Sequence, residues 1–275
     1  MQNMAQKRPM LLLIDAGNTR VKWACVALDA ALQFPADWEL IGSSSNQDYA
    51  QMLAAISPCA IARCMISNVA GNNVQQELER VLQDQFPDLH IERFTSQAQC
   101  AGLHNRYRDV SKLGSDRFAA AIAAHRQFPE LPLVVATCGT ATTVDAVTAE
   151  GLFLGGMILP GLQLMASSLA NNTAQLPQIT AGAELPSLFA DNTDQAIASG
   201  CIHAQLGAIL CAVQSLARHV ENKSAEPIQV IISGGAATYL LPQLKQSDQM
   251  HWHHFDNLVL SGLWIAASSS QSSFH

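Results

Sequence analysis

The sequence predicts an α/β protein that consists of two related domains, and three observations support this fold class. An unbroken apolar run at residues 10–14 leads into a Gly-Asn turn, and β-favouring residues follow at 20–28, which is the pattern of a hairpin. A strand at 64–70, a helix and a strand at 89–94 come next. The opening pattern recurs at 131–147, where a buried strand, a Gly-Thr turn and a β-branched strand follow one another.

The other segments fill out the two domains. Residues 42–47 are polar and predict a loop, and Ser115 is a candidate N-cap for an alanine-rich helix. A long helix rich in small and apolar residues is expected at 191–220, which suits close helix packing such as that across a dimer. The serine-rich tail after residue 267 has the composition of a frayed end. Two domains are expected, with the boundaries 1–112 and 113–275.

The composition limits the classes of function. Hydrophobic residues make up 49% of the 275 residues and charged residues 13%, which is typical of a compact globular protein. A formal net charge of −7 argues against a nucleic-acid partner, because phosphate binding needs a basic face. No apolar run approaches the roughly 18 residues of a membrane span, and the run at 10–14 is too short for the core of a signal peptide. We therefore expect a cytoplasmic protein with no membrane partner.

Cysteine and histidine patterns do not predict a metal centre. The seven cysteines are odd in number and show no CxxC spacing, which favours reduced thiols, several of them buried. The histidines of the segment HWHHF at 251–255 alternate as on one face of a strand, and a packed or solvated cluster is favoured over a metal site there.

The first motif that could carry chemistry is the turn from Asp15 to Lys22. A turn that contains Gly17 after a buried strand exposes successive backbone N–H groups, and such a concavity binds anions. Lys22 adds a positive charge, and Asp15 could hold Mg²⁺ through water. On this segment alone, an ordinary hairpin turn with a solvated lysine is an equal alternative, because the motif is not the GxxxxGK[ST] loop.

The second motif is the segment GSDR at Gly114–Arg117. An Asp beside an Arg at a helix start offers a carboxylate that can accept a hydroxyl proton and a guanidinium that can grip a carboxylate or phosphate at two points. Taken alone, the segment is better explained by Asp116 complementing the helix dipole and Arg117 forming a surface ion pair.

Glycine-rich turns form the third and fourth motifs. The segment CGTATT at 138–143 provides a second Gly-Thr turn, and GGMILPG at 155–161 allows close backbone approach. The segment ISGGAA at 232–237 ends a strand with two glycines, which would let a flat ring such as adenosine lie against the backbone. Each of these is also explained by a tight turn alone.

In this combination and order, the motifs resemble those of the type III pantothenate kinases, from residue 11 to about residue 263. That family lies in the superfamily of acetate kinase, the sugar kinases, Hsp70 and actin. The resemblance implies two RNase H-like (actin-like ATPase) domains, each a mixed sheet flanked by helices, and a homodimer with the substrate pocket near the subunit interface. It also implies phosphorylation of pantothenate by ATP with Mg²⁺ to give 4′-phosphopantothenate, the first step of coenzyme A biosynthesis.

The resemblance also assigns roles to individual positions. The ATP-phosphate segment falls on Asp15, Ala16, Gly17, Asn18, Thr19, Arg20, Val21 and Lys22. Another ATP contact falls on Thr140, and the adenosine-side glycines fall on Gly234 and Gly235. The pantothenate-binding residues fall on Tyr107, Gly114, Ser115, Asp116, Arg117 and Thr193, with Asp116 as the catalytic proton acceptor.

One position departs from the family pattern. Many members carry an Asp two residues before GTA, where it binds a monovalent cation such as K⁺ or NH₄⁺, whereas this chain has Thr137. A hydroxyl is a weaker cation ligand than a carboxylate. We therefore expect K⁺ dependence to be reduced, absent, or met by other ligands.

Two alternatives to pantothenate phosphorylation are carried forward from the sequence. One is another small-molecule kinase of the same superfamily, and the other is a non-catalytic nucleotide-binding regulator. The intact Asp15, Lys22, Asp116 and Arg117 argue against a loss of catalysis, and the sequence has no basic patch that would favour DNA binding.

Overall fold

The structure is a computed structural model that describes residues 8–34, 36–170, 187–220, 226–244 and 251–271. Its residues form two compact units. The first unit takes the described residues within 1–101, 109–123 and 259–275, and the second takes those within 102–108 and 124–258. The domain boundary expected after residue 112 would divide the chain into two continuous segments, and it stays a prediction. The compact units, in contrast, group three separate segments around the first sheet.

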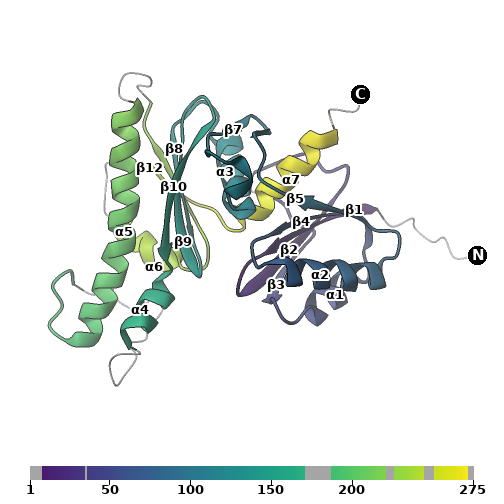
Figure 1. Ribbon diagram of the computed structural model, residues 1–275, viewed down its shortest axis with the longest axis horizontal. Coiled ribbons are helices and arrows are strands. Elements are labelled where there is room, and N and C mark those ends of the chain that lie inside the picture. Colours follow the sequence, from purple (N-terminus) through teal and green to yellow (C-terminus); the bar gives the residue numbers. More distant parts are fainter. Residues whose placement is uncertain (1–7, 35, 171–186, 221–225, 245–250, 272–275) are drawn as a thin grey trace, which may run out of the picture. The chain divides into compact units, whose positions relative to one another are not determined.

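The first unit is built on a five-stranded mixed sheet with the order β3-β2-β1-β4-β5 (Figure 1). β1 pairs antiparallel with β2, which confirms the predicted hairpin, and parallel with β4. The strands are β1 (Pro9–Ala16), β2 (Arg20–Ala27), β3 (Leu40–Ser45), β4 (Ala60–Asn68) and β5 (His90–Phe94). β3 shows that the loop predicted at 42–47 was wrong, because most of that segment pairs with β2.

Helices cover the first sheet. α1 (Ala50–Ile56) and α2 (Asn72–Gln85) pack on one face, where Met52 and Leu78 join Leu12 and Ile14 in a single core cluster. α3 (Ser115–Gln127) follows a 3₁₀ turn at Val110–Lys112, and Phe118 of this helix stacks on Phe94 of β5. The last helix, α7 (Leu258–Gln271), packs against α3 so closely that Gly262 touches the backbone of Ala119.

The second unit repeats the first sheet order. β8 (Leu133–Cys138) pairs antiparallel with β9 (Ala141–Val147) and parallel with β11 (Gln229–Ser233), as β1 does with β2 and β4. The full order is β12-β11-β8-β9-β10-β7-β6. The remaining strands are β10 (Leu152–Pro160), β12 (His251–His254), β7 (Leu103–Asn105) and β6 (Gln99–Cys100). The repeated order confirms the predicted duplication and the predicted fold of two mixed α/β sheets.

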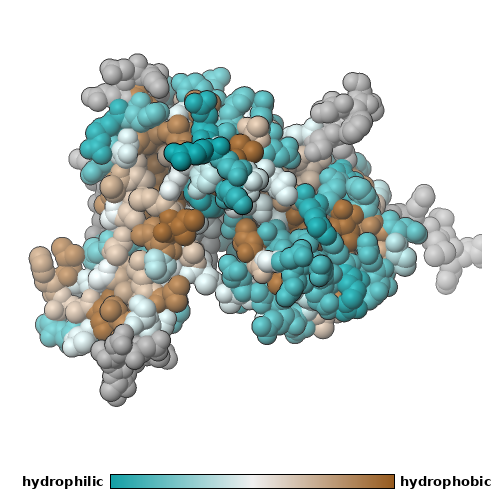
Figure 2. Space-filling view, in the orientation of Figure 1, coloured by the Kyte–Doolittle hydropathy of each residue, from teal (hydrophilic) through white to brown (hydrophobic). Residues whose placement is uncertain are grey.

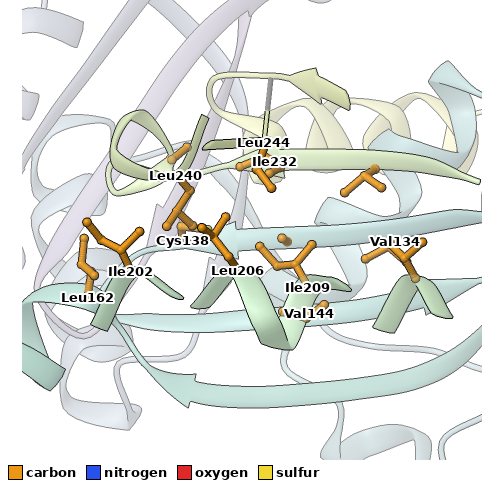
Figure 3. Packing of buried hydrophobic residues seen from close by; sticks show 14 of the residues in the cluster. Val134, Cys138, Val144, Leu162, Ile202, Leu206, Ile209, Ile232, Leu240 and Leu244 are labelled. Atoms are coloured by element: carbon orange, nitrogen blue, oxygen red, sulfur yellow. The ribbon is translucent and has the colours of Figure 1, made fainter. Parts of the chain in front are cut away.

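Three helices cover one face of the second sheet. α5 (Thr193–Val220) lays a stripe of buried side chains on the strands, with Leu206 and Ile209 close to Cys138 and Val144 (Figure 3). α4 (Leu162–Ala170) and α6 (Ala237–Leu244) complete this core cluster. α5 is long and apolar enough to cross a membrane, but a single such helix is weak support for a span, because the core helix of a soluble protein meets the same criterion.

The structure settles two further expectations. The serine-rich tail is not frayed up to Gln271, because α7 continues to that residue; residues 272–275 lie outside the described residues. The histidine segment is packed: Nε2 of His253 lies 2.8 Å from Oε1 of Gln229, and its ring lies 4.4 Å from that of Phe128. Among the described residues, no group of three or more His, Cys, Asp or Glu side chains is placed to hold a metal ion.

Candidate active site

The turn between β1 and β2 is held in shape by its surroundings. The N–H of Gly17 donates to the carbonyl of Arg20 at 2.9 Å. Asn46, which follows β3, donates from its side chain to the carbonyls of Gly17 (3.4 Å) and Asn18 (2.5 Å), and from its backbone to the carbonyl of Thr19 (3.2 Å). Because C=O and N–H point in opposite directions in a trans peptide, these bonds turn the following N–H groups away from Asn46. The turn can therefore present N–H groups to an anion.

Asp15 lies beside this turn in a charged environment. It ends β1 directly opposite Lys22 in the β1–β2 register and is only partly exposed. Burial first, and then the carboxylate of Asp116, raise the pKa of Asp15 to about 7, although Lys22 opposes the shift. The structure thus brings together two carboxylates and one ammonium group from β1, β2 and the start of α3.

The first turn of α3 presents Asp116 in a defined position. The carboxylate accepts a hydrogen bond from the N–H of Arg117 at 2.8 Å and folds over Gly114, where a Cβ would lie 2.7 Å from its Oδ1. Burial raises the pKa of Asp116, and the adjacent Arg117 counteracts this. Arg117 is 6% exposed, so it is buried and does not lie at the surface as considered from sequence. A Cβ at Gly114 would therefore push the carboxylate out of this position.

A buried hydroxyl pair joins α3 to the sheet. Ser67 near the end of β4 lies opposite Asp15 in the β1–β4 register, and its Oγ lies 2.8 Å from the Oγ of Ser115. Ser115 is already the first residue of α3, so the predicted N-cap was misplaced by one position. Its hydroxyl reaches Ser67 across the fold.

The other residues of the predicted phosphate segment differ in what they offer. The side chains of Ala16 and Val21 are fully buried in the core cluster of the first unit, so only their backbone is available to a ligand. Arg20 is exposed and donates to the hydroxyl of Ser43 at 2.6 Å. The side chains of Asn18 and Thr19 are exposed.

The second unit contains the matching turn, at Gly139–Thr140. The N–H of Gly139 donates to the carbonyl of Ala141 at 3.0 Å. It closes the turn in the way that the bond from Gly17 to Arg20 does in the first unit. Two glycines press on this turn: a Cβ at Gly161 would lie 2.1 Å from the carbonyl oxygen of Gly139, and a Cβ at Gly234 would lie 2.2 Å from that of Cys138. The backbone at Gly161 and Gly234 can therefore pack directly against the turn only because these residues have no Cβ. A Cβ at Gly235 would have no neighbour within 4 Å.

Thr137 and Tyr107 also belong to the second unit. Thr137 is partly exposed at the end of β8 and pairs with Thr143 and Ser233 on the neighbouring strands, so hydroxyl-bearing residues lie on both sides of it in the sheet. Tyr107 packs against Phe153 with a centroid distance of 6.2 Å, and its backbone N–H is fixed by the side chain of Asn105.

Thr193 is exposed at the start of α5, beside an apolar groove of about 680 Å³ between α4 and α5. Leu164, Ile197 and Cys201 are among its lining residues. Figure 2 shows hydrophobic surface over this region. The groove belongs to the second unit, whereas Asp15 and Asp116 belong to the first.

Sequence reasoning missed Asn46 and Ser67. Asn46 lies in a polar segment far from the turn that it braces, and Ser67 lies in an apolar strand where a serine is unremarkable. A useful signal for Ser67 was its position: it is the only polar side chain between Cys64 and the end-of-strand Asn68.

The donor set of the first unit fits Mg²⁺. This ion prefers oxygen ligands, keeps several waters and is commonly held by one or two carboxylates together with substrate phosphates. Asp15 supplies a carboxylate beside the turn. Burial is the main reason why its pKa is raised, and the nearby carboxylate of Asp116 adds negative charge that a divalent cation would neutralise.

Comparison with known proteins identifies the family. The family model described as type III pantothenate kinase matches residues 11–215. The chain is 50% identical over 258 residues to a type III pantothenate kinase of Herminiimonas arsenicoxydans, with 94% of this chain and 97% of that protein covered. It is 51% identical over 260 residues to one of Janthinobacterium sp. (strain Marseille), with the same coverage.

Solved structures support the fold. A conserved putative Baf family transcriptional activator from Campylobacter jejuni matches with a TM-score of 0.52 at 16% identity, covering 95% of this chain and 99% of that one. A putative 2-dehydro-3-deoxygalactonokinase protein from Sinorhizobium meliloti matches with a TM-score of 0.52 at 14% identity, covering 96% and 99%. At these identities the similarity concerns the fold alone. The sequence relatives are decisive, and the chain belongs to the type III pantothenate kinase family.

Proposed function

We propose that this chain uses ATP to phosphorylate the primary hydroxyl of pantothenate, giving 4′-phosphopantothenate for coenzyme A biosynthesis. The observation that carries the proposal is the grouping of Asp15, Lys22 and Asp116 around an anion-binding turn, in a chain of the type III pantothenate kinase family. Phosphoryl transfer needs charge neutralisation and positioning more than covalent chemistry, and this grouping supplies both.

The turn and Lys22 would hold the phosphates of ATP. Asn46 fixes the turn carbonyls on one side, so N–H groups are available on the other, and the ammonium of Lys22 lies across the strand from Asp15. Asp15 would hold Mg²⁺, through water or directly. When bound, the metal ion neutralises phosphate charge.

Asp116 would accept the proton of the pantothenate hydroxyl. Burial raises its pKa, which makes it a stronger base than an exposed aspartate, and the adjacent Arg117 opposes this shift. Arg117, with Gly114, Ser115 and Tyr107, would bind the polar end of pantothenate. Thr140, Gly234 and Gly235 are the remaining proposed nucleotide contacts.

A homodimer is part of the proposal. Support comes from the large apolar side chains exposed near α4 and α5: Leu164, Leu169, Leu188 and Phe189 are each at least 48% exposed. If a second copy of the chain covered these side chains, the dimer would gain about 25 cal/mol for each Å² of apolar surface that is buried. Thr193 lies in the same region and would contact substrate near that interface. Sedimentation of the protein with and without Leu169→Glu would test this: we expect a dimer that dissociates in the variant, and a monomeric parent protein would contradict it.

The monovalent cation requirement is proposed to be weak. Thr137 offers a hydroxyl where a carboxylate would bind K⁺ strongly, and its neighbours in the sheet are also hydroxyl-bearing residues. Initial rates measured against added K⁺ and NH₄⁺ should change little. Strong activation from near zero would contradict the proposal.

ADP release coupled to pantothenate tests the main function. Purified protein with ATP and Mg²⁺ should release ADP when pantothenate is added, and not with a sugar, acetate or polyphosphate acceptor. Release with another acceptor would point to a different kinase of the fold, and nucleotide binding without any release would point to a regulator.

A further inference from the structure

A pair of buried serines links β4 to the first turn of α3 in the first unit. Ser67 is fully buried on β4 and pairs in the sheet with Asp15, while Ser115 is 9% exposed and directly precedes Asp116. Their hydroxyl oxygens are 2.8 Å apart, which is a typical hydrogen bond between hydroxyl groups. The bond therefore connects the strand beside Asp15 to the helix turn that carries Asp116.

We propose that the Ser67–Ser115 hydrogen bond is a positioning device that fixes the first turn of α3, and with it Asp116, relative to the end of β1. The proposal rests on the role of Asp116 as the proton acceptor. The bond acts through the backbone that Ser115 shares with Asp116. The contact proposed between Ser115 and pantothenate would then be made by its backbone, because its hydroxyl is bonded to Ser67.

Other contacts fix the body of α3 further along the helix. Phe118 stacks on Phe94 with a centroid distance of 6.2 Å, and Ala119 is packed against Gly262 of α7. Both contacts lie beyond the acidic residue. At the helix start, the hydroxyl of Ser96 lies 3.4 Å from the carbonyl of Gly114, which is a long hydrogen bond. The serine pair is the shorter link at this end.

Loss of the bond should affect turnover more than nucleotide binding. The phosphate turn has its own braces in the Gly17–Arg20 bond and in Asn46, and Ser67 takes part in neither. A reacting group displaced by about 1 Å can cost on the order of 100-fold in rate. A hydroxyl deletion that loosens one helix turn should lie below that limit. We expect kcat to fall roughly tenfold, with the KM for ATP changed by less than about twofold.

The test uses variants of the full chain in the pantothenate-dependent ADP-release assay. Ser67→Ala should lower kcat as above, and Ser67→Ala combined with Ser115→Ala should be no worse than the poorer single variant, because both remove one bond. Ser67→Thr retains the hydroxyl, and Ser67→Val has the same shape as the Thr variant but no hydroxyl. The Thr variant should therefore have a clearly higher kcat than the Val variant. Ser44→Ala, which removes another buried hydroxyl of this unit, should leave kcat unchanged.

Three results of the rate measurements would overturn the proposal. They are a kcat for Ser67→Ala within twofold of the parent, equal rates for the Thr and Val variants, and a double variant whose loss equals the product of the two single losses. A rise in the KM for ATP that matches the fall in kcat would also overturn it, because it would indicate general loosening of the site. Failure of the proposed function is distinguishable, because the parent protein would then release no ADP with pantothenate.

Discussion

Replacing Asp15 with Asn should stabilise the ligand-free protein in a pH-dependent way. Burial and the nearby Asp116 raise the pKa of Asp15 from 3.8 to about 7. Between these two values the folded chain holds a proton that the unfolded chain has released, so stability is greatest at low pH and falls as pH rises towards 7. Between pH 5 and pH 8, the contribution of Asp15 to the free energy of unfolding falls by the equivalent of about two pKa units. At 1.36 kcal/mol per unit, this is roughly 3 kcal/mol.

The amide of Asn has nearly the same shape as the carboxyl group and does not titrate. The advantage of Asp15→Asn over the parent should therefore grow by about that amount between the two pH values. For a chain of this size, about 1 kcal/mol corresponds to a Tm change of roughly 2–4 °C. Thermal unfolding in buffer with EDTA at pH 5 and pH 8 measures the difference. The matched control is Asp88→Asn, at an exposed position of the same unit, which should show no such growth.

Activity should move in the opposite direction. Asp15→Asn removes the proposed Mg²⁺ ligand, so turnover should be lost while the protein becomes more stable. The reasoning is refuted if Asp15→Asn lowers Tm at pH 8, or if its gain is the same at both pH values. Either result would mean that the carboxylate is not held in the folded chain at an electrostatic cost.

Three further predictions address single contacts. Asp116→Asn should abolish turnover with ADP affinity by calorimetry retained; loss of ADP binding would reassign the residue to the nucleotide. Asn46→Asp removes the donors that brace the phosphate turn and adds negative charge, so the KM for ATP should rise at least tenfold, and an unchanged KM would count against the brace. Gly262→Ala would place a Cβ 1.9 Å from the carbonyl oxygen of Ala119 and should lower stability by about 1–3 kcal/mol or more in urea unfolding, whereas Gly207→Ala, with open space, should not. Equal effects at the two glycines would contradict the close packing of α7 on α3.

The fold was predictable where local pattern and tertiary context agree. The hairpins and the duplication follow from apolar runs and turn residues, and the sheet orders bear them out. β3 was missed because Gly42 and the serines after it have turn-like composition. In the structure Gly42 pairs with Trp23, and a Cβ there would lie 2.4 Å from the indole ring. The glycine is therefore required by a neighbouring strand's side chain, which the local sequence does not reveal.

The end of α7 was missed for a similar reason. Serines are poor helix formers because their hydroxyls compete for backbone groups. Here the hydroxyls of Ser268 and Ser269 donate to the carbonyls of Trp264 and Ile265, each at 2.9 Å, inside the helix. The packed apolar half of α7 extends the helix into a segment whose own composition favours fraying.

The candidate site was predictable as a set of residue types but not as an arrangement. The carboxylate and the lysine are visible in the motif, because Asp15 and Lys22 flank one turn. The link between Ser67 and Ser115 is not visible, because it depends on α3 packing on β4, 48 residues away in the sequence. The sequence predicted that the Ser115 hydroxyl would cap its own helix, whereas in the structure it pairs with Ser67, which is distant in the sequence.

The two duplicated turns share a backbone arrangement but differ in chemistry. In the second unit Thr137 lies between Thr143 and Ser233, at the sheet position that Asp15 occupies next to Lys22 in the first unit. The backbone is thus repeated while its charges are not. One turn with a carboxylate and an ammonium group suits a metal-bound phosphate chain, and a neutral turn suits contacts through N–H and hydroxyl groups. The uncharged row at Thr137 is compatible with the proposed transfer, and it offers hydroxyl groups rather than a carboxylate to a monovalent cation.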